Sequence, residues 1–397
     1  MDSVINPFTP GAGSRPPELT GRNKQITDFT TLIKRMQIGK PQKSLMITGL
    51  RGVGKTVLLN TFGDIAESER LKTAKVEITH EMDFKLTITR LLRKVILSFS
   101  PISRMKQYGM EALGILKAFS IKNETGLEFN ISVDAISGMA DSGDLEADLA
   151  DLFIAAAKAA HEHGTGIVFL VDEIQFLDKS SLEALISALH QVNQKNLPLT
   201  VVGAGLPHVP GLSGEAKSYA ERLFQYPVIG KLDRHEAKLA LTLPAKKEAV
   251  DFHDDATQTI IDFTDGYPYF LQEYGQHAWN IAKNSEITKE DAVQARGEVV
   301  ATLDESFFRV RIGRCTGAEI RYMSAMSSLG KGPYRSQCIA EKLERKIESV
   351  SPLRSRLIHK GLVYGPGYGL TDFTVPQYDD YMRREHPFST LVPPDQK

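Results

Sequence analysis

The sequence predicts an α/β protein with a parallel-sheet core, a helical region after it and a mixed helix–strand domain at the end. Short apolar runs with the length of buried strands, such as Ser44–Thr48 and Ile167–Val171, alternate with segments of helical periodicity. From Asp233 onward the pattern becomes helical, and short strand-like segments separated by glycines follow around residues 361–374. These three observations define the fold class.

Composition limits the classes of protein that fit the chain. Its 397 residues suggest two or three domains, and 42% hydrophobic with 24% charged residues is typical of a globular protein. A net charge of −1 excludes a general attraction to nucleic acid or anionic membranes, so any basic surface must be local. Two cysteines, no apolar run long enough to span a bilayer and no signal peptide predict a cytoplasmic location without membrane contact.

The predicted elements begin with an extended arm over residues 1–17, which are rich in proline and glycine. The core, residues 18–232, opens with a helix, a strand, a glycine-rich loop and a second helix, and then continues with a further strand and helix. The segments expected in this part are a helix from Ile26 to Met36, strand Ser44–Thr48, a helix with Val57–Leu59, strand Lys75–Thr79 and a helix from Leu86 to Phe99.

Residues 100–142 interrupt this rhythm. Phe119–Lys122 and Leu127–Val133 alternate apolar and polar residues around the turn-like segment Asn123–Gly126, which predicts a β-hairpin insertion on the core. The α/β pattern then returns. It comprises helix Leu145–His161, strand Ile167–Val171, a helix with apolar residues from 182 to 192 and strand Leu199–Val202.

Two further regions complete the domain prediction. Residues 233–300 are expected to form a helical lid, because Asp233 with Glu236 and Thr288 with Asp291 have the spacing of helix starts. Residues 301–397 are expected to form a separate C-terminal domain.

The glycine-rich loop has the residue types that a triphosphate requires. Glycines at 49, 52 and 54 allow successive backbone N–H groups to point at phosphates, at the positive end of the following helix. In the pattern Gly-x4-Gly-Lys-Thr, Lys55 reaches the β- and γ-phosphates and Thr56 ligates Mg²⁺. The residues expected to bind ATP are therefore Gly49, Gly52, Val53, Gly54, Lys55, Thr56 and Val57.

A second motif ends the buried strand Ile167–Val171. Asp172 and Glu173 would lie at the sheet edge where α/β proteins bind ligands. Asp172 is expected to hold Mg²⁺ with Thr56, and Glu173 to polarise the attacking water. The alternative, an acidic pair that only caps the next helix, fits less well beside the phosphate loop.

With these motifs the chain resembles AAA+ and STAND-type P-loop ATPases, in the branch similar to bacterial and archaeal origin initiators. The resemblance implies that Gly21-Arg22 lies against the nucleotide base and that the proline of Gly266-Tyr-Pro268 lies against adenine. It also implies the full fold class, a P-loop NTPase core of the ASCE/AAA+ type with a helical lid and a C-terminal winged helix. ATP and Mg²⁺ are the cofactors that it implies.

Departures from the family pattern indicate slow turnover. Val201–Gly205 offers no polar sensor for the γ-phosphate, and Pro268–Phe270 replaces a sensor arginine. Arg222 follows the last core strand, where it is either an arginine finger for a neighbouring subunit or a structural charge, ion-paired with Glu221 or Glu215 or solvated on a helix. Gln175 contacts either the attacking water or the loop, the loop being favoured. Arg51 is interpreted as a packing or ion-pair residue rather than a catalytic one.

The C-terminal domain is predicted to be a winged helix. Helices are expected around Ile320–Leu329, Arg335–Leu343 and Ser351–His359, followed by a wing at Tyr364–Thr374. Between Lys331 and Gly361, eight Lys/Arg residues stand against three acids. The candidate DNA contacts are Arg335, Arg354, Arg356 and Lys360.

The sequence therefore predicts an ATP-hydrolysing switch that couples nucleotide state to duplex DNA through the winged helix. The alternative is a STAND-type signalling or defence ATPase whose winged helix packs on the lid. Its partner would be a protein or a second copy of the chain. A third reading, an ATP-binding scaffold without turnover, is disfavoured by Glu173.

Overall fold

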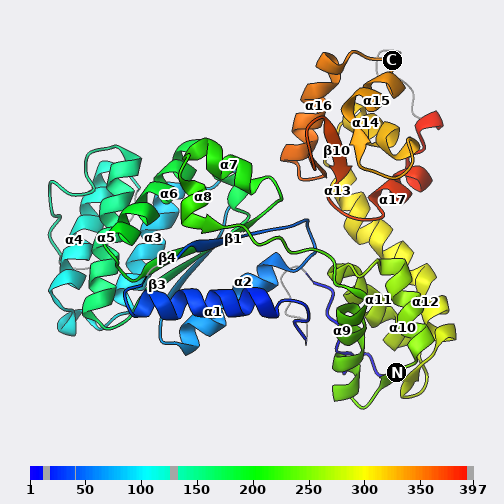
Figure 1. Cartoon of the computed structure of the whole chain (residues 1–397), viewed down its shortest axis with the longest axis horizontal. Helices are drawn as coiled ribbons and strands as arrows, with labels where there is room; N and C mark the ends of the chain where they lie inside the picture. The colour runs from blue at the N-terminus through cyan, green and yellow to red at the C-terminus, as the bar shows by residue number, and fades with distance from the viewer. Residues whose placement is uncertain (12–17, 41, 126–132, 391–397) are drawn as a thin grey trace. The chain divides into compact units, whose positions relative to one another are not determined.

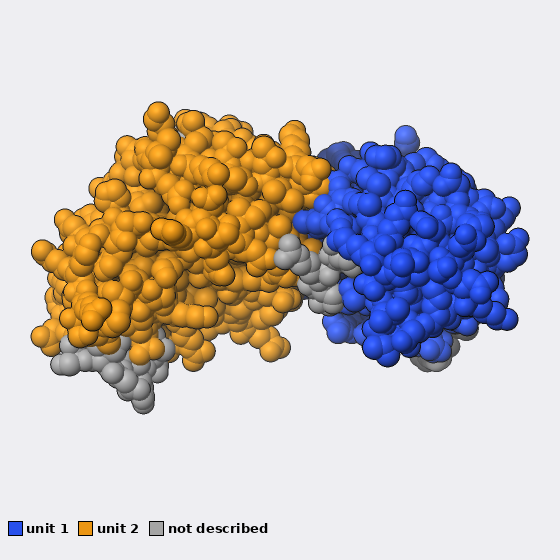
Figure 2. Space-filling model, turned by 90° about the horizontal axis from the view of Figure 1, so that it is seen from below, with its two compact units in different colours: residues 1–21, 50–54, 230–397 blue, residues 22–49, 55–229 orange. Residues whose placement is uncertain are grey.

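The computed structural model describes residues 1–11, 18–40, 42–125 and 133–390. The chain forms two compact units, coloured separately in Figure 2. Unit 2 comprises residues 22–49 and 55–229, and unit 1 comprises residues 1–21, 50–54 and 230–397. The tip of the glycine-rich loop, Leu50–Gly54, therefore groups with the C-terminal half of the chain.

Unit 2 is built on a five-stranded parallel sheet with the strand order β2-β3-β4-β1-β5 (Figure 1). Every residue of β1, β3 and β4 is buried, because helices cover both faces of the sheet. The strands are β1 Ser44–Thr48, β2 Lys72–Glu77, β3 Ile167–Asp172, β4 Leu199–Gly205 and β5 Phe224–Gln225.

Two aromatic stacks illustrate the packing on the two faces. Phe29 of α1 stacks on Phe62 of α2 at 4.2 Å between ring centroids, and Phe153 of α5 stacks on Phe169 of β3 at 5.0 Å. The helices of unit 2 are α1 Asn23–Gln37, α2 Lys55–Ser68, α3 Phe84–Leu97, α4 Gln107–Lys122, α5 Leu145–Glu162, α6 Lys179–Gln194, α7 Val209–Ala216 and α8 Ala220–Leu223.

The predicted hairpin insertion is wrong in its first strand. Phe119–Lys122 is the last turn of α4, and Phe119 is fully buried whereas Ile121 is 64% exposed. Helical packing of α4 against α5 overrides the local alternation of apolar and polar residues. The proposed partner strand, 127–133, lies outside the described residues except for Val133.

In unit 1, residues 1–11 run along α11 and connect to it by specific contacts. Trp279 donates to the carbonyl of Asp2 at 2.9 Å, and the buried ring of Phe8 lies against Gly275. The region expected to be a lid, called the lid below, consists of the helices α9 Arg234–Lys247, α10 Asp254–Thr264, α11 Pro268–Ile281 and α12 Lys289–Thr302 with the short strands β6 Asp251–Phe252 and β7 Glu286–Ile287. The two predicted capping boxes are present at the starts of α9 and α12.

A π-helical segment, Leu303–Arg309, and α13, Val310–Ile312, lead from the lid into the C-terminal domain (residues 314–390). In the described residues this domain has four α-helices and an antiparallel sheet of order β8-β10-β9. The three helices expected from the sequence correspond to α14, α15 and α16, whereas β8 and α17 were not predicted. The elements are α14 Gly317–Ser328, β8 Tyr334–Arg335, α15 Ser336–Lys342, α16 Ile347–His359, β9 Val363–Tyr364, β10 Leu370–Phe373 and α17 Tyr378–Glu385.

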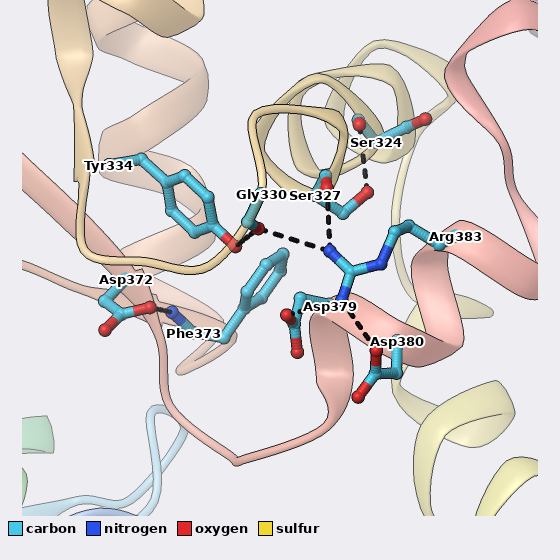
Figure 3. Close-up of polar contacts among 9 residues, drawn as sticks. All are labelled: Ser324, Ser327, Gly330, Tyr334, Asp372, Phe373, Asp379, Asp380 and Arg383. Atoms are coloured by element: carbon cyan, nitrogen blue, oxygen red, sulfur yellow. Dashed lines mark hydrogen bonds and ion pairs between the residues drawn. The ribbon is translucent and has the colours of Figure 1, made fainter.

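Arg383 fastens α17 to the end of α14 (Figure 3). Its guanidinium donates to the carbonyls of Ser327 at 2.8 Å and Gly330 at 3.2 Å, and to the carboxylates of Asp379 and Asp380 on its own helix. An arginine here satisfies carbonyls at a helix C-terminus, where positive charge is favourable. No helix in the described part of the chain is long and apolar enough to cross a membrane.

Asp372 of β10 gives the C-terminal domain a pH-dependent stability. Burial raises the pKa of this carboxyl above its usual value, although a hydrogen bond from the Phe373 amide opposes the shift. A raised folded-state pKa means that protonation favours the folded form, so the destabilisation develops as pH rises above the unfolded-state pKa and is complete once pH exceeds the folded-state pKa. We expect Asp372→Asn to raise the melting temperature at neutral pH. The gain should shrink in acid; an equal gain at every pH would contradict the prediction.

Candidate active site

The phosphate loop leaves the carboxyl end of β1, which lies between β4 and β5 in the sheet, and α2 begins directly after it at Lys55. Gly52 and Gly54 have left-handed backbones, with φ of 81° and 91°. Residues with side chains rarely adopt these values, so the predicted glycines are required by the loop's conformation.

In unit 2 the loop's chemical groups converge on the end of β3. The Lys55 side chain is buried and its ammonium donates to the carbonyl of Gly49 at 3.0 Å. The Thr56 hydroxyl donates to Oδ2 of Asp172 at 2.6 Å. The sequence motifs, 116 residues apart, are thus joined by a direct hydrogen bond.

Asp172 is only 2% exposed, and burial raises the pKa of its carboxyl. The hydrogen bond from Thr56 opposes this shift, while the neighbouring charge of Glu173 adds to it. A buried carboxylate beside a hydroxyl offers the hard oxygen ligands that Mg²⁺ prefers, and a bound cation would compensate the buried charge. The two residues therefore fit a magnesium site completed by phosphate oxygens and water.

Glu173 lies beyond the end of β3 with a left-handed backbone, φ 52°, which is unusual for a residue with a side chain. Its amide donates to Oδ1 of Asp172 at 3.0 Å. The side-chain NH₂ group of Gln175 donates to Oε2 of Glu173, and the side-chain Oε1 of Gln175 accepts from the backbone N–H of Leu206 at 3.1 Å. The sequence favoured a loop contact for Gln175 but gave no sign of its bond to Glu173.

In unit 1 the loop tip packs against the start of α11. The Tyr267 hydroxyl donates to the carbonyl of Arg51, and the backbone amide of Tyr269 donates to the carbonyl of Gly52 at 3.2 Å. A Cβ on Gly52 would lie 3.1 Å from the Tyr267 ring. The sequence singled out the lid motif for Pro268, which occupies the first turn of α11, but it did not identify the tyrosines on either side.

The remaining predicted nucleotide ligands have defined places. Gly21 has φ 70°, and a Cβ at this position would lie 2.6 Å from Oε2 of Glu236 and 2.9 Å from the side chain of Leu232, at the start of the lid. Arg22 is buried immediately before α1, and Val53 and Val57 are also buried. The predicted roles of these four residues in nucleotide binding stay predictions.

Arg222 is exposed on the short helix α8, and no ion pair joins it to Glu215 or Glu221 among the described residues. An exposed arginine at this place is compatible with a role toward a second subunit. It remains a proposal.

The four candidate DNA contacts differ in their surroundings. Arg335 is exposed. Arg354 donates to Thr371 at 2.7 Å and to the carbonyl of Leu370 at 2.9 Å. Arg356 and Lys360 both bond the buried carboxylate of Glu319, at 3.2 and 2.7 Å. Three of the four cations are therefore engaged inside the C-terminal domain.

The loop after β1, the acidic pair at the end of β3 and the parallel sheet between helices define a P-loop NTPase. Residues 18–202 match the model of the AAA ATPase domain family, and residues 305–382 match that of a domain of unknown function. The chain thus contains an AAA-type P-loop ATPase domain, which confirms the predicted class. No curated protein matches the chain.

Several solved structures are similar over nearly the whole chain. The Walker-type ATPase PABY2304 of Pyrococcus abyssi aligns at 14% identity over 95% of this chain and 99% of that one, with a TM-score of 0.57. The ORC1 protein of Aeropyrum pernix, solved in complex with DNA, aligns at 15% identity over 95% and 96% of the two chains, with a TM-score of 0.44. The RuvB Holliday junction branch migration motor of Thermotoga maritima aligns at 15% over 96% and 99%, with 0.45. At these identities the likeness to the first concerns the fold alone, and the other two are too loose to support an argument.

Proposed function

We propose that this ATPase is a slow nucleotide-driven switch whose lid and C-terminal domain respond to the conformation of the phosphate loop. The observation that carries the proposal is the position of the loop tip, Leu50–Gly54, inside unit 1. Backbone amides of such a loop bind phosphates directly, so nucleotide binding fixes its conformation. Any group packed on the loop tip is then sensitive to the bound nucleotide.

Two elements of unit 1 pack on the tip. The lid does so through Tyr267 and Tyr269, and the C-terminal domain does so at Gly361, where an added Cβ would lie 2.5 Å from a guanidinium nitrogen of Arg51. Gly361 follows the C-terminus of α16, so the arginine lies at the negative end of a helix dipole. This placement fits a charge that holds the C-terminal domain to the loop.

The lid and the C-terminal domain are also joined by a chain of aromatic rings. Tyr269 stacks on Phe307 at 4.9 Å, and Phe307 contacts Phe308 at 5.3 Å. Phe308 in turn packs against Tyr378 at 5.0 Å. Because these rings are close-packed, a shift of Tyr269 cannot be absorbed locally, which supports a mechanical link from loop to C-terminal domain.

Slow hydrolysis is the second part of the proposal. Gly203 and Gly205 at the end of β4 provide no polar side chain to stabilise charge on the γ-phosphate. Mg²⁺ at Thr56 and Asp172 would supply charge neutralisation of the phosphates when bound. Glu173 would accept hydrogen bonding from the attacking water, and Lys55 would hold the phosphates in place.

These contacts of the C-terminal domain favour the alternative in which the winged-helix-like domain packs on the lid. In that alternative the switch acts on a protein partner or on a second copy of the chain. Duplex DNA is kept as a second candidate because the excess of five positive charges between Lys331 and Gly361 remains, with Lys331, Arg335, Lys342 and Lys346 exposed. Duplex binding that weakens steeply with added salt would support DNA as the output, and binding that is absent at low salt would exclude it.

The switch is tested at Arg51. We expect Arg51→Ala to release bound fluorescent ATP faster than the wild type, by a factor in the typical allosteric range of about 5 to 150. The reason is that the substitution removes the contact between loop tip and C-terminal domain while it leaves the phosphate-binding groups intact. Arg90→Ala, an exposed arginine on α3, serves as the control. Equal release rates for both variants and the wild type would contradict the switch.

A further inference from the structure

The carboxyl end of β4 lacks polar side chains, and side chains from other elements occupy the space beside its glycines. A Cβ on Gly205 would lie 2.5 Å from the side-chain oxygen of Gln175, and a Cβ on Gly203 would overlap the Met46 sulfur. The glycine at 205 therefore makes room for a side chain that arrives from the loop after β3. The amide group of Gln175 stands where a polar residue of β4 itself would otherwise project.

Gln175 is held rigidly in this place. It lies in a 3-10 turn, Ile174–Phe176, whose first residue is 1% exposed, and the Phe176 amide bonds the carbonyl of Glu173 at 3.0 Å. Both polar groups of its side-chain amide are hydrogen-bonded: the NH₂ group donates to Glu173, and the oxygen accepts from the backbone N–H of Leu206. A fixed backbone and two opposed hydrogen bonds leave this side chain little rotational freedom.

We infer that Gln175 is a positioning residue for hydrolysis, which fastens the carboxylate of Glu173 to the end of β4. The inference rests on the proposed role of Glu173 toward the attacking water. With Oε2 bonded by Gln175, the Oε1 oxygen makes no hydrogen bond within the described residues and is available to accept one from water. A base that is oriented by a third group is the usual arrangement in active sites, and small displacements of it reduce the rate strongly.

The connection to Leu206 adds a structural consequence. Leu206 directly follows β4, so a movement of this strand end would be transmitted to Glu173 through one side chain. The glycines of β4 have no side chain that could connect this strand to Glu173. Gln175, in the loop after β3, makes this polar connection instead.

The test separates the two hydrogen bonds of Gln175. Gln175→Glu keeps an oxygen for the Leu206 N–H but replaces the donor to Glu173 by a second carboxylate, whereas Gln175→Ala removes both bonds. We expect each variant to lower kcat about 10- to 100-fold with ATP affinity and KM unchanged. In a Glu173→Gln background, Gln175→Ala should lower kcat no further, because the group that it positions is already lost.

Three outcomes would overturn the inference in a wild-type protein that hydrolyses ATP. They are wild-type kcat in Gln175→Glu, a loss of ATP affinity as large as the loss of kcat, and additive losses in the double variant. A merely structural glutamine would give the third result. If the purified wild type does not hydrolyse ATP although Lys55→Ala shows that it binds through the loop, the proposed function itself fails.

Discussion

A Glu173→Gln protein is expected to bind ATP normally and to hydrolyse it about 10²- to 10⁴-fold more slowly than the wild type. The substitution keeps the size of the side chain and an oxygen that can accept from Gln175. It removes the negative charge that would polarise water beside the Thr56–Asp172 pair. The chemical step is therefore affected, and the phosphate-binding loop is not.

The measurement is single-turnover phosphate release together with equilibrium binding of a fluorescent ATP analogue. Glu215→Gln, an exposed carboxylate on α7, is the matched control and should behave as the wild type. Lys55→Ala should lose binding, which separates a binding defect from a chemical one. If Glu173→Gln hydrolyses ATP at the wild-type rate, Glu173 is not the residue that activates water, whatever its position.

Much of the core could be predicted because local sequence determines it. The strand Ser44–Thr48 is predicted at its observed bounds, since a short apolar run between a polar segment and the glycine-rich loop has few other interpretations. The starts of α9 and α12 follow from capping boxes, which need only residues three apart. Two motifs with independent chemical meaning predict that Thr56 and Asp172 share a magnesium site, and in the structure these two side chains are joined by a direct hydrogen bond.

The features that escaped prediction depend on long-range contacts. The side chain of Tyr267 bonds the loop 216 residues earlier, and no local pattern marks an aromatic residue for that role. Positive charge on α16 suggested DNA contacts, but the sequence does not reveal that Arg354 turns toward β10 or that Glu319 binds Arg356. The last turn of α4 was mistaken for a strand because four alternating residues fit either period.

Gly266 is the position where a single methyl group should disturb the lid most. Its φ of 71° is left-handed, and a Cβ there would overlap the carbonyl oxygen of Leu232. The same two residues are joined by a backbone hydrogen bond of 2.9 Å from the Leu232 amide to the Gly266 carbonyl. Backbone strain of about 1–2 kcal/mol and overpacking of about 1–3 kcal/mol predict that Gly266→Ala lowers the free energy of unfolding by about 2–5 kcal/mol.

The lid carries its own reporter for this prediction, because Trp279 of α11 is the chain's single tryptophan and is fully buried. Urea unfolding followed by its fluorescence should give a lower midpoint for Gly266→Ala. Gly297→Ala on α12, where an added Cβ meets nothing within 4 Å, should leave the midpoint unchanged or raise it. Gly266→Asn separates the causes, since asparagine tolerates a left-handed backbone but keeps the Cβ. If Gly266→Asn is as stable as the wild type, the close approach of residue 266 to the Leu232 carbonyl does not constrain the lid. In that case the neighbouring Tyr267, which contacts the phosphate loop, is not held in place by this approach.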